Sequence, residues 1–188
     1  MIFSTNSIQN LRTLTCIQNA DALFQAMMKQ KQTTVDPRFW INYATFLMTT
    51  VNNPTRARSL LQRAMQSVQP QHHRELTSKF GVLEFKSPNG DAERGRTVFE
   101  GLLATFPKRY DLWDVFISLE VANGEIDNAR ALYERLSQQK MKANKAKALF
   151  KRWHAFEEKH GNRKTTEHVK SRATEYLENL KNKSEEEE

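Results

Sequence analysis

The stretch WDVFISLEVANGEIDNARALYER, residues 113–135, has the pattern of two helices joined by a short turn. Its large apolar residues recur every three positions, at Trp113, Phe116 and Leu119. This spacing places them on one stripe of a helix. Asn123-Gly124 interrupts the pattern, and a second run with apolar residues at helical spacing begins at Ala129-Arg130. We therefore predict a helical hairpin.

The same pattern occurs four times along the chain. The first-helix stripes are Trp40-Tyr43-Phe46, Thr77-Phe80-Leu83, Trp113-Phe116-Leu119 and Phe150-Trp153-Phe156, and their first residues lie 37, 36 and 37 positions apart. A second-helix run follows each stripe, beginning at Ala57, Gly95, Ala129 and Val169. A further run of this second kind, residues 20–27, predicts half a repeat before the first full one.

One hairpin cannot bury its own apolar stripe, so neighbouring hairpins must cover each other. We expect an all-α fold, a right-handed superhelical solenoid of antiparallel helix pairs, over residues 17–181. Residues 1–16 do not match the repeat, and 182–188 are expected to form an acidic disordered tail. An open aromatic site for bases is the alternative for the stripes, but their regular period favours a core. The expected core residues are Trp40, Tyr43, Phe46, Phe80, Phe99, Trp113, Phe116, Tyr133, Phe150, Trp153 and Phe156.

Turn and capping residues agree with this division. Asp36-Pro37 and Asn53-Pro54 each place a capping side chain before a proline that suits a first helical turn. Asp111 is expected to cap the helix that carries Trp113. Three glycines separate first from second helices, where the left-handed conformation is expected, at Gly90, Gly124 and Gly161.

Composition limits the fold and the chemistry further. Only 6 Gly and 5 Pro occur among 188 residues, and Val and Ile are scarce, so an all-β sandwich is excluded. The single Cys16 can form neither an internal disulfide nor a thiolate metal cluster. No apolar run approaches the roughly 20 residues that a membrane span needs, so no membrane is expected among the partners.

The motifs resemble the half-a-TPR (HAT) repeat family, whose first helix carries Trp, an aromatic residue and Glu, and whose second carries Ala-Arg, an aromatic residue and Glu-Arg. The third copy here matches best, with Trp113, Phe116 and Glu120 followed by Ala129-Arg130 and Tyr133-Glu-Arg. Ordinary tetratricopeptide repeats have a 34-residue period and different signatures. The resemblance implies a place in RNA-processing assemblies.

Residues 78–113 and 150–177 are also similar to the carboxy-terminal part of a large pre-ribosomal RNA processing protein family, called programmed cell death protein eleven in animals. That resemblance implies a nucleolar factor with many OB-fold RNA-binding domains ahead of its helical repeats. This chain has no room for an OB-fold domain. It is therefore expected to be a fragment, the product of a truncated gene model or a separate short paralogue.

The sequence contains no catalytic motif. Its five histidines lack a metal-site spacing such as His-Glu-x-x-His, Cys16 has no neighbouring histidine, and no glycine-rich phosphate loop occurs. We expect no catalytic residue, no cofactor, no metal and no small-molecule substrate. Three glutamates follow the apolar stripes, and we interpret them as structural groups paired with second-helix arginines. The expected acceptors are Glu84, Glu120 and Glu157, and the candidate donors are Arg58, Arg96 and Arg130.

Basic residues supply the best candidate for a functional surface. The net charge is +7, and it is +11, from 29 basic and 18 acidic residues, when the terminal four glutamates are set aside. No acidic residue lies between Leu136 and Phe156. Such a cluster can neutralise phosphates, although a solvated lysine-rich face is the simpler explanation. The residues expected to contact RNA or a partner are Lys140, Lys142, Lys145, Lys147, Lys151 and Arg152.

With the resemblance included, the expected function is a non-enzymatic scaffold in ribosomal RNA processing and early small-subunit ribosome assembly, in the nucleus and nucleolus. It would bind protein assembly factors of the pre-ribosome and touch pre-ribosomal RNA through the lysines. Two alternatives stay open. One is a HAT scaffold of messenger RNA 3'-end processing or splicing, and the other is a direct RNA-binding module.

Replacing Trp113 with Ala is expected to lower the free energy of unfolding by roughly 3–5 kcal/mol, because the change removes buried aromatic surface and leaves a cavity. Urea denaturation followed by circular dichroism measures the loss. An unchanged unfolding curve would show that the indole is not part of a core.

Overall fold

The computed structural model describes residues 5–186, and the side chains of residues 13–30 and 32–179. Every regular element in this part of the chain is helical, so the predicted all-α class is confirmed. The α-helices are α1 (Thr5–Met27), α2 (Lys31–Thr34), α3 (Pro37–Thr49), α4 (Pro54–Ser67), α5 (His73–Lys86), α6 (Ala92–Thr105), α7 (Tyr110–Ala122), α8 (Ile126–Ser137), α9 (Ala143–His160) and α10 (Arg163–Glu186). One 3₁₀ turn, η1 (Pro70–His72), precedes α5.

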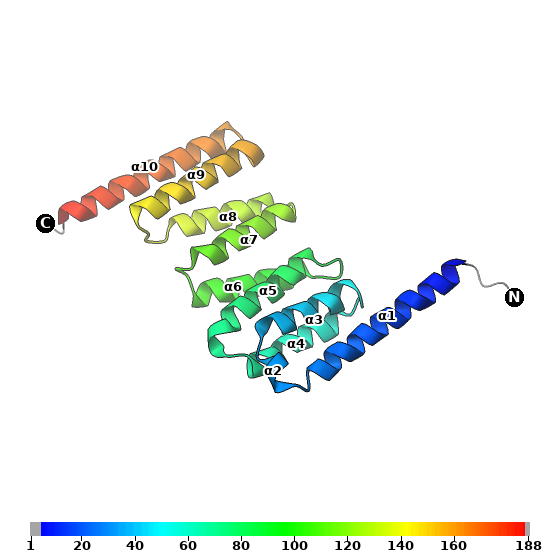
Figure 1. Ribbon diagram of the computed structural model, residues 1–188. Helices are drawn as coiled ribbons and strands as arrows, with labels where there is room; N and C mark the ends of the chain where they lie inside the picture. The colour runs from blue at the N-terminus through cyan, green and yellow to red at the C-terminus, as the bar shows by residue number, and fades with distance from the viewer. Residues whose placement is uncertain (1–4, 187–188) are drawn as a thin grey trace. The chain divides into compact units, whose positions relative to one another are not determined.

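The helices pack as consecutive pairs, α3 with α4, α5 with α6, α7 with α8 and α9 with α10 (Figure 1). These are the four hairpins expected from the repeat. The chain divides into two compact units, Met1–Pro107 and Lys108–Glu188, each holding two hairpins. The backbone of α10 is helical to Glu186 and so includes part of the segment assigned to an acidic tail. Residues 187 and 188 of that tail lie outside the described residues.

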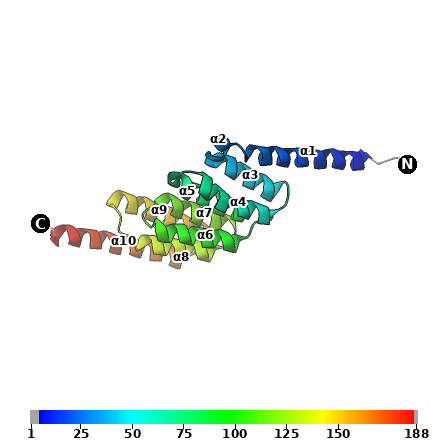
Figure 2. The same cartoon turned by 90° about the horizontal axis from the view of Figure 1, so that it is seen from below.

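Aromatic side chains fill the core of the first unit. Trp40 and Tyr43 on α3 are almost fully buried, and the Trp40 indole N–H donates to the backbone oxygen of Thr34 at 2.8 Å. Phe24 of α1 stacks on Tyr43 with ring centroids 4.7 Å apart. The second half of α1 therefore occupies the predicted half-repeat position. Its first half, which includes most of the non-matching segment 1–16, projects past α3 (Figures 1 and 2).

In the second unit, the corresponding apolar stripe of α9 packs against α8. The Trp153 and Tyr133 rings are nearly parallel, 3° apart, with centroids at 5.9 Å. Of the eleven side chains expected in the core, ten are buried, and Phe46 is partly buried against the core of the first unit. Burial of large aromatic rings between helices is what makes neighbouring hairpins depend on each other.

Two of the three predicted helix caps are present. The carboxylate of Asp36 accepts from the Arg38 N–H at 2.9 Å, and the amide oxygen of Asn53 accepts from the Arg56 N–H at 3.0 Å. The expected cap by Asp111 was wrong. Because α7 starts at Tyr110, two residues before the start that an Asp111 cap implies, Asp111 lies inside the first turn and pairs with the Arg109 guanidinium at 2.9 Å. A carboxylate in the first turn still complements the helix dipole.

The glycine prediction holds at one of three turns. Gly124 has φ of 85°, the left-handed conformation expected after α7. Gly90 and Gly161 do not have a positive φ, so that expectation was wrong for them. They are required for a different reason: an added Cβ would collide with the Glu84 backbone oxygen at Gly90, and with the carboxylate of Glu157 and the Thr165 hydroxyl at Gly161.

Buried carboxylates join each hairpin to the next within both units. Arg58 on α4 donates to both oxygens of Glu84 on α5, at 2.7 and 2.8 Å. Arg130 on α8 does the same to Glu157 on α9, at 2.8 and 3.1 Å. These two predicted pairs are confirmed.

Glu120 is also fully buried and accepts from the Asn128 side-chain amide at 3.4 Å. The guanidinium of Arg96 is 2.6 Å from Glu93. The pair of Glu120 with Arg96 stays a prediction.

Replacing Glu157 with Gln is expected to remove part of the acid dependence of stability. Burial alone would raise the pKa of Glu157, but the hydrogen bonds from Arg130, Thr165 and Trp153, together with the charge of Arg130, outweigh it, and the pKa is lowered. A lowered folded-state pKa stabilises the protein above about pH 5, and this contribution is lost as the pH falls through that pKa. Urea denaturation between pH 2.5 and 7, values chosen around the roughly 4.3 of a free Glu, should show a shallower slope for the variant. The matched control is Glu158→Gln, because Glu158 is exposed. Equal slopes for both variants would contradict the assignment.

Candidate functional site

The six predicted basic residues lie on the loop 138–142, between α8 and α9, and on the first three turns of α9. Helix geometry separates those on α9, because side chains two positions apart point about 200° away from each other. Lys145 and Arg152 are seven residues, or two turns, apart and share one face. Lys147 and Lys151 are four apart and share another. The structure therefore divides the predicted cluster.

Helix α7 occupies the face of Lys145 and Arg152. The guanidinium of Arg152 is 2.6 Å from the Asp114 carboxylate, and the Lys145 ammonium lies over the Tyr110 ring, 4.9 Å from its centroid. The sequence of the basic cluster alone does not predict these contacts, because Asp114 and Tyr110 belong to the preceding hairpin. The repeat period could have suggested these contacts, because it places residues of one first helix beside those of the next first helix.

The remaining lysines keep their charge available to a partner. Lys140, Lys142, Lys147 and Lys151 are all exposed, and within the described side chains none of them forms an ion pair. We call these four the basic surface. Lys142 is also the N-cap residue of α9, and the first turn of this helix has no acidic residue. Positive charges at a helix N-terminus are unfavourable by themselves, and a bound anion would relieve that.

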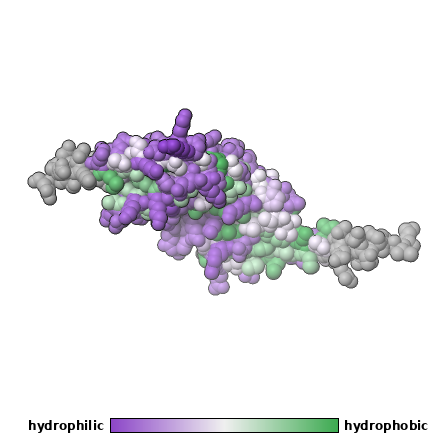
Figure 3. Space-filling model, turned by 90° about the horizontal axis from the view of Figure 1, so that it is seen from above, coloured by the Kyte–Doolittle hydropathy of each residue, from purple (hydrophilic) through white to green (hydrophobic). Residues whose placement is uncertain are grey.

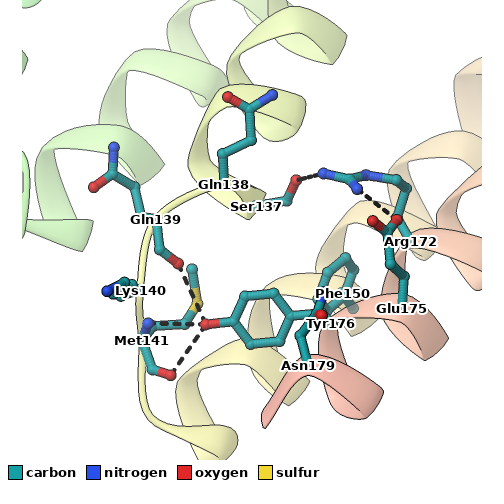
Figure 4. Close-up of a pocket in the computed structure, with 10 residues that line it drawn as sticks. All are labelled: Ser137, Gln138, Gln139, Lys140, Met141, Phe150, Arg172, Glu175, Tyr176 and Asn179. Atoms are coloured by element: carbon teal, nitrogen blue, oxygen red, sulfur yellow. Dashed lines mark hydrogen bonds and ion pairs between the residues drawn. The ribbon is translucent and has the colours of Figure 1, made fainter. Parts of the chain in front are cut away.

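Tyr176 on α10 fixes the loop that carries Lys140 and Lys142. Its hydroxyl accepts from the Met141 N–H at 2.8 Å and can donate to the oxygen of Met141 at 3.1 Å or of Gln139 at 3.3 Å (Figure 4). Met141 is 8% exposed, whereas both neighbouring lysines are exposed. Tyr176 therefore holds the backbone between the two exposed lysines in place.

A pocket of about 510 Å³ lies between this loop and α10. In Figure 4 the Tyr176 ring spans from α10 to the loop, with Arg172 and Glu175 on one side and Gln139 and Met141 on the other. The pocket is lined by Ser137, Gln138, Gln139, Lys140, Met141, Phe150, Arg172, Glu175, Tyr176 and Asn179. Sequence reasoning missed it, because it forms only when residues about 35 positions apart come together.

Arg172 on α10 is one of the charged residues that line the pocket. Its guanidinium is 2.7 Å from Glu175 and 2.9 Å from Glu134 on α8. The hydrogen bond with Glu175 raises the pKa of Arg172 above its ordinary value. The His168 imidazole is 3.0 Å from the same Glu134. Apart from Lys140, the charged groups that line the pocket therefore compensate each other.

Hydrophilic residues cover most of the face shown in Figure 3, and hydrophobic residues appear between them as small patches. Among the described residues, no group of three His, Cys, Asp or Glu side chains could hold a metal ion. No described helix is both long and apolar enough to cross a membrane. Among the described side chains, lysines without an ion pair lie beside a pocket lined by aromatic and amide groups.

Comparison with known proteins identifies relatives along most of the chain. The family described as Suppressor of forked protein (Suf) matches residues 6–187. The rRNA biogenesis protein rrp5 of Schizosaccharomyces pombe is 43% identical over 158 residues, which are 84% of this chain and 9% of that protein. The mouse protein RRP5 homolog is 32% identical over 161 residues, 86% of this chain and 8% of that protein.

An Arabidopsis thaliana rRNA biogenesis protein RRP5 is 39% identical over 124 residues, 66% of this chain and 6% of that protein. This chain thus spans less than a tenth of the length of each of these relatives. The resemblance to the HAT-repeat part of the pre-ribosomal RNA processing family is confirmed.

Replacing Tyr176 with Phe is expected to loosen the loop 138–142. The Met141 N–H loses its acceptor, so the free energy of unfolding should fall by about 1 kcal/mol. Hydrogen exchange at the Met141 amide should become faster. Tyr110→Phe is the matched control, because the Tyr110 hydroxyl has no hydrogen bond to a described residue. Unchanged exchange at Met141 would mean that the hydroxyl does not hold the loop.

Proposed function

This chain belongs to the Suppressor of forked (Suf) family of HAT-repeat proteins, and we propose that it is a non-enzymatic scaffold in ribosomal RNA biogenesis. The proposal rests first on its relatives, several of which are named as rRNA biogenesis proteins. Because the chain matches only a small part of each relative, the role that we propose for it lies within a larger assembly. Early small-subunit assembly is the stage we propose, and the nucleus and nucleolus are the locations.

Stacked hairpins support a scaffold role on physical grounds. The large rings and the carboxylates that might suggest chemistry are used inside the fold: Glu84 and Glu157 are each bound by an arginine of the preceding hairpin. Helical repeats extend a surface by adding units, and each unit presents loops and an outer helix face to partners. Protein assembly factors of the pre-ribosome are the partners that we propose for these faces.

The single observation that carries contact with pre-ribosomal RNA is the basic surface. Its four exposed lysines are not neutralised by any described acidic side chain, and Tyr176 holds two of them in a fixed loop. Lysines that neutralise phosphates release counterions, which gives affinity without sequence preference. A fixed loop lowers the entropy lost on binding. Arg152 and Lys145 take a smaller part, because α7 already engages them.

Purification of the tagged chain from cells, followed by identification of what accompanies it, tests the assembly. Pre-ribosomal particles are the expected companions. Splicing or polyadenylation factors in their place would overturn the ribosomal role and favour a scaffold of messenger RNA processing. This experiment does not depend on direct RNA contact.

Replacing Lys140 and Lys142 together with Glu is expected to weaken binding of a labelled single-stranded RNA by at least roughly 10-fold near physiological salt. The salt dependence of log Kd should fall by about 1.4, because two phosphate contacts are lost. Fluorescence anisotropy measures both quantities. The free energy of unfolding should stay within about 0.5 kcal/mol, since both residues are exposed.

The matched control is the double variant Lys79→Glu and Lys86→Glu, which makes the same change of charge at exposed positions of α5. If the two double variants bind RNA equally well, the basic surface is not the contact. The scaffold proposal would then rest on protein partners alone.

A further inference from the structure

We propose that the pocket between the loop 138–142 and α10 receives one base of a single-stranded RNA whose phosphates lie on Lys140 and Lys142. This inference rests on the proposed contact with pre-ribosomal RNA and specifies its form. The apolar stripes themselves are largely buried, and of the fourth stripe only its first residue, Phe150, lines this site. It lies at the end of a hairpin, where the stripe stops and the loop turns.

The walls of the pocket match the chemistry of a nucleobase. The half-buried Tyr176 supplies an aromatic ring, which packs against the buried Phe150 with centroids 5.8 Å apart, and bases stack on such rings regardless of their sequence. The side-chain amides of Gln138, Gln139 and Asn179 also line it. Each amide presents both a donor and an acceptor, which is the combination that base edges require.

Charge separates the place of a base from the place of a phosphate. Inside the pocket Arg172 is shared by two carboxylates, at 2.7 Å from Glu175 and 2.9 Å from Glu134. Beside Arg172 a phosphate would meet Glu175 and a guanidinium that two carboxylates already neutralise, so this part of the pocket suits a neutral polar ring. Lys140 both lines the pocket and belongs to the basic surface, and Lys142 follows it in the loop. A base inside the pocket, with its phosphates on the two lysines outside, matches both the interior and the lysines.

Size and rigidity agree with this assignment. The pocket volume of about 510 Å³ lies within the roughly 300–1,000 Å³ typical of small-ligand sites. Tyr176 both forms a wall and fixes the opposite side through its bonds to the backbone of Met141 and Gln139. The pocket therefore exists before the base arrives, which reduces the cost of binding. A protein partner would have to place a polar side chain here next to the same lysines.

The test compares two probes on the unaltered chain and two variants. One probe is a labelled single-stranded RNA of mixed sequence, about ten nucleotides long to fill one site, and the other is an abasic oligonucleotide of equal length and charge. The pocket is blocked by Asn179→Trp, at an exposed position of α10 that lines it. The matched control is Glu178→Trp, the exposed neighbour that does not line it. Anisotropy gives Kd for each pair.

We expect the unaltered chain and Glu178→Trp to bind the RNA roughly 10-fold more tightly than the abasic probe, and Asn179→Trp to bind the two alike. All three should bind the abasic probe equally, because the lysines are intact. If the unaltered chain binds both probes equally, or if Asn179→Trp keeps the preference, the base pocket is overturned while phosphate contact stands. If neither probe binds, the RNA contact itself fails.

A second measurement needs no variant. RNA containing 4-thiouridine, cross-linked to the unaltered chain by light and mapped by mass spectrometry, should attach within residues 137–141 or 172–179. Attachment only at other segments would overturn the inference, and this holds even where Asn179→Trp alters the fold.

Discussion

A helical hairpin of this chain has more apolar surface than its two helices can cover, and this constraint determines the rest of the structure. The rings on each first helix must be buried by the hairpin before or after it. In the second unit Trp153 is covered by Tyr133 from the preceding hairpin, and in the first unit Tyr43 is covered by Phe24. Stability is therefore shared between neighbours.

Apolar stripes alone would allow neighbouring hairpins to slide along each other. The buried carboxylates restrict this sliding. Two bidentate ion pairs, Arg58 with Glu84 and Arg130 with Glu157, have a geometry that is satisfied in one register only. A buried ion pair adds little net stability, but a misplaced one leaves a charge without a partner. At α1 the charges are reversed: Asp21 on α1 accepts from Arg56 and from the Tyr43 hydroxyl. Polar contacts therefore also connect α1 to the first hairpin, but through different residues.

Because the rings and carboxylates are used inside the fold, the residues that remain for function lie at the ends of the hairpins. The loop 138–142 combines exposed lysines, a buried Met141 and a pocket, and one residue of α10, Tyr176, organises all three. Residues on a loop vary freely in what they present, while a fixed scaffold holds them in place. That combination is suited to an RNA strand on a larger particle, as we propose.

The period of 36 or 37 residues was enough to predict the helices, their pairing and the buried rings, because helical spacing and the need for burial act locally and repeat. It also predicted Arg58 with Glu84 and Arg130 with Glu157, since equivalent positions in equivalent repeats have equivalent neighbours. Local signals failed where a helix start shifted by two residues or where a close approach mattered. Asp111 lies inside its helix, and Gly161 makes room for Glu157 without a left-handed turn.

Only the tertiary structure separated six similar basic residues into two groups. Their charges are alike in the sequence, but Asp114 and Tyr110 come to two of them from another hairpin, and the other four stay open to solvent. The pocket likewise depends on Tyr176 meeting a loop about 35 residues earlier. The sequence by itself determined what must be buried, because burial follows from residue type and spacing. Which charges stay free depends on partners brought from distant positions, and those are fixed only when the hairpins pack.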